Sequence, residues 1–319
     1  MRMKPQFVVA AGVVFTALSA IFVRLSVAPA LAIAAWRMVF TVGMLLPLFI
    51  RERAGGPVRD YSNADGAATE PSPPTPRAAV LLSLASGTLL ALHFALWITS
   101  LSYTSVASST VLVTTHPIIV AVLGFLVLGE RISLRSTMFI LAALGGSVFL
   151  VWGGLGTGGS APLGNLLALL GAVTVSGYIL LGRVVRRRLS VNNYTMIVYT
   201  TAAALLVAAA LLAGVPLAPY APREFVIFAA LALFCTLLGH SLFSWALKYL
   251  KPTVISTSIL GEPVIASALA VVLFGEIPEL STLVGGGVIL ASIYLFVRQE
   301  ARDARAAGIG HRSDHDDDL

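Results

Sequence analysis

The sequence is dominated by long, uninterrupted apolar runs, and we count ten of them. A helix that crosses the roughly 30 Å of bilayer hydrocarbon needs about 20 mostly apolar residues. The runs do not alternate apolar and polar residues, so a transmembrane β-barrel does not fit. The sequence therefore predicts an all-α integral membrane protein with ten transmembrane helices. The expected spans are Phe7–Arg24, Ala30–Ile50, Ala78–Leu101, Val106–Leu128, Thr137–Trp152, Leu163–Val185, Tyr194–Ala213, Phe225–Leu247, Thr253–Phe274 and Glu279–Val297.

The composition excludes a water-soluble fold. Of the 319 residues, 57% are hydrophobic and 11% are charged, and the mean hydropathy is +0.91, whereas a soluble domain carries about 25% charged residues. The lone Cys235 lies inside an apolar run and excludes a disulfide framework or a Cys-rich metal site. We expect no cofactor and no metal site.

The basic residues, which give a net charge of +6, indicate orientation and not a nucleic-acid partner. Eighteen of the 21 Lys and Arg residues fall on the side of the N-terminus, and Arg24 and Arg223 fall on the other. The positive-inside rule then predicts that both termini are cytoplasmic. The polar, Pro-rich loop 51–76 and the tail 299–319 are expected to be disordered.

The sequence contains an internal repeat. WITSLSYTSVASSTVL, from Trp97, aligns with WALKYLKPTVISTSIL, from Trp245. Further on, PIIVAVLGFLVLGE and PVIASALAVVLFGE align. We expect residues 1–152 and 153–298 to form two repeats of five spans each, and five is odd, so the second repeat would be inverted. Two inverted halves can exchange conformations, which suits alternating access. The first run is expected to remain uncleaved, because its removal would break the repeat.

The motifs resemble those of a known family. The WR pair at Trp36 and Arg37, PIIVAVLGFLVLGERIS and EPVIASALAVVLFGE resemble the EamA family of the drug/metabolite transporter superfamily, over roughly residues 6–298. The resemblance implies a multi-pass carrier of the prokaryotic plasma membrane. Such carriers often export amino acids or related metabolites.

Two titratable residues occupy equivalent positions in the repeats. Glu262 immediately precedes Pro263, and His116 immediately precedes Pro117, each about ten residues into its span. A proline removes one helical hydrogen bond, so each position can expose backbone carbonyls to a polar cavity. We expect both residues to line the substrate site, with Glu262 binding a substrate ammonium or a proton. The alternative is that Glu262 hydrogen-bonds a neighbouring helix and fixes packing.

Six further residues are candidates for substrate binding. Arg37 could bind a carboxylate with two hydrogen bonds, or could instead extend to the interface. The others are aromatic or imidazole side chains that could form a cavity wall, and their alternative role is packing or an interfacial tryptophan belt. They are His93, Trp97, Tyr178, His240 and Trp245. The hydroxyl cluster that includes Thr110 and Thr114 is interpreted as packing, and Glu130 and Glu276 as stabilising turns or gates.

These features favour a secondary carrier that exports a small metabolite, with an amino acid as the best guess. Carriers of nucleotide-like metabolites such as S-adenosylmethionine, or of drugs, are the alternatives within the class, and a non-transporting receptor or scaffold is the alternative outside it. The sequence has no HExxH or GxSxG motif and no phosphate-binding loop, so we expect neither an enzyme nor ATP drive within this chain. The expected partners are a small-molecule substrate, protons and the lipid bilayer, but no nucleic acid. A homodimer stays open.

Overall fold

The structure, a computed structural model, describes residues 4–54, 73–104, 106–130, 132–150, 161–274 and 280–306. These residues are all-helical, and no strand occurs among them. The helices are α1 (Pro5–Leu25), α2 (Ala30–Ala54), α3 (Pro76–Ser100), α4 (Val106–Val113), α5 (His116–Leu128), α6 (Leu134–Leu150), α7 (Ala161–Val185), α8 (Val191–Leu212), α9 (Pro222–Ala230), the π-helix η3 (Leu231–His240), α10 (Ser241–Ala246), α11 (Pro252–Ile259), α12 (Glu262–Phe274) and α13 (Leu280–Ala306).

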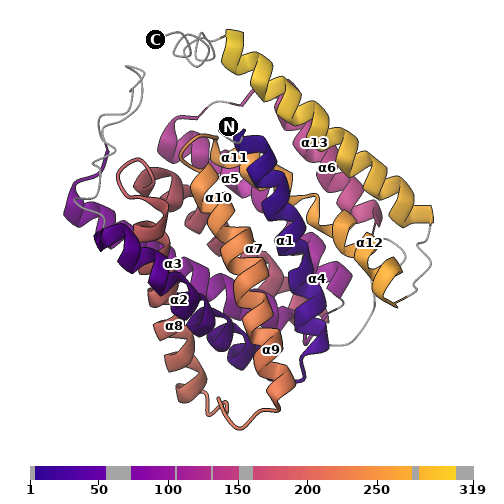
Figure 1. Ribbon diagram of the computed structural model, residues 1–319. Coiled ribbons are helices and arrows are strands. Elements are labelled where there is room, and N and C mark those ends of the chain that lie inside the picture. Colours follow the sequence, from indigo (N-terminus) through magenta and orange to yellow (C-terminus); the bar gives the residue numbers. More distant parts are fainter. Residues whose placement is uncertain are drawn as a thin grey trace.

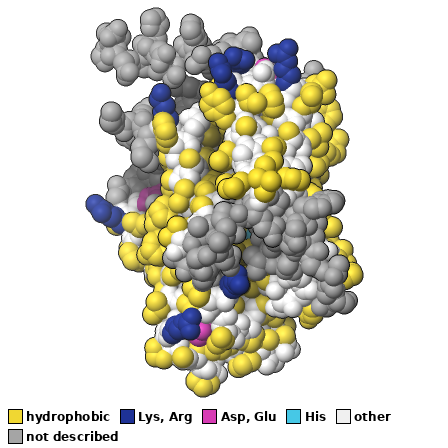
Figure 2. Space-filling model, turned by 90° about the vertical axis from the view of Figure 1, so that its right-hand side faces the viewer, with side chains coloured by type: hydrophobic (Ala, Val, Ile, Leu, Met, Phe, Trp, Pro, Cys, Tyr) yellow, Lys and Arg dark blue, Asp and Glu magenta, His cyan; other side chains and the backbone are white. Residues whose placement is uncertain are grey.

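Seven of the described helices are long and apolar enough to cross a membrane. They are Pro5–Leu25, Ala30–Ala54, Pro76–Ser100, Pro162–Val185, Val191–Leu212, Pro222–Ala246 and Leu283–Asp303. Two shorter apolar helices, His116–Leu128 and Leu134–Phe149, accompany them. On the face shown in Figure 2, hydrophobic side chains cover much of the described flank, and several Lys and Arg side chains gather at the upper end. The chain is therefore a multi-pass membrane protein.

The fourth and ninth expected spans are each broken in two, at equivalent places. A proline ring clashes with the carbonyl four residues earlier and has no N–H to donate to it. Four residues before Pro117 is Val113, where α4 ends, and four residues before Pro263 is Ile259, where α11 ends. The two prolines then stand in the first turns of α5 and α12. The breaks follow directly from the sequence.

The eighth expected span is continuous but contains the ten-residue π-helix η3 between α9 and α10. Two side chains hydrogen-bond to carbonyls five residues earlier, as the wider turn allows. Thr236 Oγ1 donates to the Leu231 carbonyl at 3.3 Å, and Ser241 Oγ donates to the Thr236 carbonyl at 3.3 Å. π-helical turns are rare and often occur at functional sites.

The packing of the helices repeats between the two halves. Elements at equivalent places meet in pairs, namely α2 with α8 and α6 with α13. The second part of each broken helix meets the first part of the other, α5 with α11 and α12 with α4, and α3 packs on α7 as η3 packs on α1. In Figure 1, α6 and α13 lie side by side at one edge of the molecule, and α2 and α8 lie on the other side. The start of α1 and the end of α13 are at the same end of the bundle.

A glycine permits the close contact between α6 and α13, but two neighbouring glycines take no part in it. A Cβ at Gly146 would lie 3.1 Å from the Gly285 carbonyl oxygen, so a larger residue there would push α6 and α13 apart by a few tenths of an ångström. Gly145 and Gly287 have nothing within 4 Å of such a Cβ, so these two glycines make no close helix contact.

The helices extend further than the sequence predicts at two ends. α2 continues through residues 51–54, where Glu52 accepts hydrogen bonds from Asn192 (2.6 Å) and Asn193 (3.0 Å) of α8. α13 continues through residues 299–306, where Glu300 accepts from Lys251 (2.9 Å) and Ser136 (2.8 Å). These hydrogen bonds join both helix ends to neighbouring helices. The prediction of disorder was therefore wrong for residues 51–54 and 299–306. The rest of the loop up to residue 72, and residues 307–319, lie outside the described residues.

Candidate functional site

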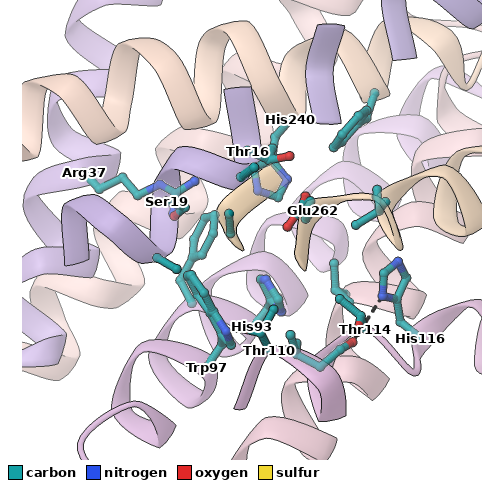
Figure 3. Close-up of a pocket in the computed structure, with 18 residues that line it drawn as sticks. Thr16, Ser19, Arg37, His93, Trp97, Thr110, Thr114, His116, His240 and Glu262 are labelled. Carbon is teal, nitrogen blue, oxygen red and sulfur yellow. Dashed lines mark hydrogen bonds between the residues drawn. The ribbon is translucent and has the colours of Figure 1, made fainter. Parts of the chain in front are cut away.

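Both halves of the chain contribute to a cavity of about 70 Å³ in the middle of the bundle. By volume it has room for a few water molecules as it stands. Figure 3 shows Glu262 near its centre, with Arg37 and His116 on opposite sides of it. The lining residues are Thr16, Ala17, Ser19, Ala20, Arg37, His93, Phe94, Trp97, Thr110, Val113, Thr114, His116, Val175, His240, Phe243, Ile259, Glu262 and Ala266.

Arg37 of α2 is almost completely buried, with 1% of its surface exposed. Its Nε donates to Thr236 Oγ1 of the π-helix at 2.8 Å, and its Nη1 donates to Ser19 Oγ of α1 at 3.1 Å. The guanidinium lies over the ring of Phe94, with Cζ 4.1 Å from the ring centroid. Its Nη2 is buried and has no hydrogen-bond partner among the described residues. The side chain therefore does not extend to the membrane interface, and one of its donors remains available to a ligand.

His116 and Glu262 each lie at the start of the second part of a broken helix. His116 Nδ1 lies 3.1 Å from the Val113 carbonyl, which is the carbonyl that Pro117 leaves without its helical donor. A carbonyl only accepts, so Nδ1 carries the proton, and Nε2 of the neutral ring is an acceptor. This Nε2 is buried without a hydrogen-bond partner among the described residues. At the second break, Ile259, the residue four before Pro263, also lines the cavity.

Imidazole and aromatic rings form one wall of the cavity. His93 stacks on Trp97, with 6.2 Å between ring centroids and an interplanar angle of 3°, and its Nδ1 lies 3.0 Å from the Gly171 carbonyl. His240 presents its ring edge-on to Phe94, at 5.4 Å. Although three histidines line the cavity, no group of three or more His, Cys, Asp or Glu in the described part of the chain is placed to hold a metal ion.

Six of the eight residues expected at the site line this cavity, namely Arg37, His93, Trp97, His116, His240 and Glu262. Tyr178 and Trp245 do not. The hydroxyl of Tyr178 pairs with Ser244 Oγ at 2.9 Å, and Trp245 packs against Tyr249 with 4.6 Å between ring centroids. The expected cavity wall was wrong for Trp245 because it follows His240 by five residues, a rotation of about 140° around a helix. His93 and Trp97 are four residues apart and share a face.

Comparison with known protein families identifies the family of this protein. A model of the EamA-like transporter family matches residues 3–152 and again residues 162–298. The chain belongs to the EamA-like transporter family. The two separate matches agree with a two-repeat architecture, and the family is one of membrane transporters.

A crystal structure shares the fold of this EamA-like protein. It covers 93% of this chain and 98% of its own, with a TM-score of 0.72 and 16% sequence identity. At that identity the likeness extends to the fold alone. Among proteins with curated descriptions, none matches the chain.

Several cavity residues of this EamA-like protein were missed from the sequence. Thr16 and Ser19, one turn apart on α1, both line the cavity, as do Phe94 and Phe243. The two hydroxyls carried a signal, since they are polar residues in an apolar span. The two phenylalanines carried none, because every span contains such residues. Thr110 and Thr114, interpreted as packing residues, also line the cavity.

One end of the EamA-like bundle is tied together by Arg183 of α7. Its Nη1 donates to the carbonyls of Leu247 (2.8 Å) and Lys248 (3.2 Å), just after α10 ends, and its Nε lies 3.9 Å from Glu130 Oε1, after α5. Arg183 lies in the last turn of α7 and is buried, with its guanidinium bonded to carbonyls at the end of α10. Glu276, the repeat counterpart of Glu130, lies outside the described residues.

Proposed function

We propose that this protein is a secondary carrier that exports a small zwitterionic metabolite, an amino acid or a close analogue, across the plasma membrane. The proposal includes ten membrane crossings, two inverted halves and alternating access. One observation carries it: a single cavity holds an arginine with a donor that no described residue bonds and, on another wall, an acidic side chain. A zwitterion with a carboxylate and an ammonium complements this pair.

The carboxylate of the substrate would bind at Arg37. The hydrogen bonds from Arg37 to Ser19 and Thr236 and its stacking on Phe94 hold the guanidinium in place. Its Nη2 then supplies a charge-assisted hydrogen bond, which is shorter and stronger than a neutral one. A pre-positioned donor loses little side-chain entropy when a ligand binds.

The ammonium of the substrate would bind where acceptors gather. Glu262 lies in the first turn of α12, where the positive end of the helix dipole stabilises a negative charge. The His116 Nε2 acceptor has no partner among the described residues. An ammonium has three donors and no acceptor, so it suits such a set. A proton on Glu262 would compete with the ammonium, which gives a direct route to proton coupling.

Alternating access is supported by the repeated packing of the two halves. Arg183 ties α7 to the ends of α5 and α10 at one end of the bundle. Toward the opposite end, where α1 ends and α2 begins, lies a second hollow of about 190 Å³ that shares Ala20 with the central cavity. This arrangement suits a carrier that is closed at one end and accessible from the other.

Counterflow of labelled amino acids in proteoliposomes tests the proposal. We expect the wild-type protein to exchange at least one small amino acid, and Glu262→Gln to lower exchange at least ten-fold and flatten its pH dependence. Asp303→Asn is the matched control, because among the described residues Asp303 accepts a hydrogen bond from Gln299 of the same helix and lies far along α13 from the cavity residues; it should exchange normally. Absence of counterflow across a broad panel of zwitterions would favour a scaffold, and normal exchange by Glu262→Gln would remove Glu262 from the site.

A further inference from the structure

The largest of the hollows described here, about 370 Å³, is a slot between α1 and α13. Its floor is α11 and the start of α12, where Val254 and Gly261 are buried. Its rims are exposed side chains, among them Val14 of α1 and Leu290 of α13. The Ser258 hydroxyl in the slot donates to the Val254 carbonyl at 2.8 Å, so it needs no outside partner. The slot therefore suits an apolar occupant.

The slot is about two-thirds to four-fifths as long as one bilayer leaflet is thick. It extends along α1 from Gln6 to Val14 and along α13 from Leu290 to Val297. At a rise of 1.5 Å per residue these stretches are roughly 10 to 12 Å long, whereas half of the bilayer hydrocarbon is about 15 Å thick. An acyl chain that lies along α1 would reach from the membrane surface to near the midplane.

Basic side chains lie near the end of the slot where α1 begins. Lys4 precedes α1, and Arg298 and Arg302 follow the slot residues on α13; all three are exposed. Lys251, at the start of α11, is paired with Glu300. The exposed charge at this end is thus mainly positive, as an anionic headgroup requires.

We propose that the slot binds one acyl chain of an anionic phospholipid, with the phosphate near Lys4 and Arg298. The apolar floor, a length within one bilayer leaflet and the basic residues at one end together favour this occupant over a zwitterionic lipid or a second copy of the protein. The site is separate from the central cavity, and its occupancy is measured without transport.

The slot lies next to the central cavity, because residues that line the two are neighbours on α1 and at the start of α12. Val13 of the slot precedes Thr16 of the cavity by one turn, and Gly261 directly precedes Glu262. A Cβ at Gly261 would lie 3.4 Å from Val13 Cγ1 and 3.7 Å from Ile293 Cδ1, so α1, α12 and α13 meet closely there. A lipid acyl chain bound in the slot would therefore pack against the start of α12, which holds Glu262.

Native mass spectrometry of the purified full chain tests lipid binding. We expect the wild-type protein to retain one phosphatidylglycerol molecule at least ten-fold more than phosphatidylcholine with the same acyl chains. Ala10→Trp fills the slot and should abolish this preference. Leu81→Trp is the matched control, since Leu81 is 65% exposed on α3, the same five residues after the start of its helix. Equal retention of both lipids, or an unchanged preference in Ala10→Trp, would overturn the proposal.

A double variant tests whether the basic residues bind the lipid headgroup. Lys4→Gln combined with Arg298→Gln should lower the preference for phosphatidylglycerol at least five-fold, because each basic residue near an anionic surface contributes about five-fold. An unchanged preference would contradict the headgroup site.

The competing occupant, a second copy of the protein, is tested by cross-linking. In a Cys235→Ser background, Tyr294→Cys should not cross-link two protein chains in liposomes. Efficient cross-linking would show that a second copy occupies the slot.

Discussion

At the scale of single residues, Arg37 is unusual because it is buried among hydroxyls and an aromatic ring, and no ion pair joins it to a carboxylate in the described part of the chain. A charge at mid-bilayer costs at least about 2.5–3.5 kcal/mol on insertion scales, and a buried donor without a partner costs a further 1–3 kcal/mol or so. A purely structural arginine would have all its donors satisfied. The unpaired Nη2 is explained if a substrate carboxylate supplies the missing partner.

Arg37→Lys keeps the charge but removes the planar fork, so the residue cannot bind Ser19, Thr236 and a carboxylate together. We expect the KM for the exchanged amino acid to rise at least ten-fold, measured by counterflow. Ser19→Ala removes only one of the bonds that position Arg37 and should raise KM by less. A substrate affinity unchanged by Arg37→Lys would show that Arg37 has only a packing role.

At the scale of elements, the two broken helices place His116 and Glu262 at the cavity. Pro117 and Pro263 explain both breaks, but of the exposed carbonyls that the sequence predicted there, that of Val113 is bonded by His116 Nδ1. The π-helix could not be predicted in this way. Its sequence, LALFCTLLGH, is as apolar and regular as an α-helical span, and the wide turn depends on tertiary partners such as the bond from Arg37 to Thr236.

Pro263→Ala restores an N–H that can bond to the Ile259 carbonyl, so α11 and α12 can join into one helix. Glu262 would then turn away from its present place. We expect counterflow to fall at least ten-fold while the protein stays folded, as judged by its elution in size-exclusion chromatography. Pro47→Ala is the matched control, because Pro47 is exposed inside the unbroken α2. Normal counterflow by Pro263→Ala would mean that the break has no part in transport.

The contacts of Arg183 predict a stability effect at the end of α10. Arg183→Gln loses the bonds to the Leu247 and Lys248 carbonyls, and hydrogen bonds from charged groups contribute roughly 1.5–3 kcal/mol each. We expect the apparent Tm in detergent to fall by several degrees. Arg77→Gln, at the exposed start of α3, should leave Tm unchanged. Equal Tm values for Arg183→Gln and the wild-type protein would show that these bonds are replaced by water.

At the scale of the whole molecule, the repeat in the sequence predicted much of the arrangement. Aligned prolines in the two halves predicted the places of His116 and Glu262, and both residues line one cavity. The contribution of α1 was not predicted. Thr16 and Ser19 resemble the many hydroxyls that let membrane helices pack closely, and only the tertiary contact of Ser19 with Arg37 distinguishes it.

The number of membrane crossings can be tested by labelling single introduced cysteines, because the protein has one native cysteine and it is buried. Between Ala221 and Ala301 the chain passes through α9 to α10, then α11 to α12, then α13. If these are three crossings, the two exposed residues lie on opposite sides of the membrane, and the positive-inside rule predicts Ala301 on the inside.

We therefore expect a membrane-impermeant maleimide to label Ala221→Cys in intact cells, and Ala301→Cys only after permeabilisation. The wild-type protein should stay unlabelled, since Cys235 has no exposed surface. Labelling of both variants from the same side would mean an even number of crossings in this stretch, which an inverted pair of five-helix halves does not allow. The reversed pattern would keep the ten crossings but invert the orientation, and with it the direction in which the open end of the cavity faces.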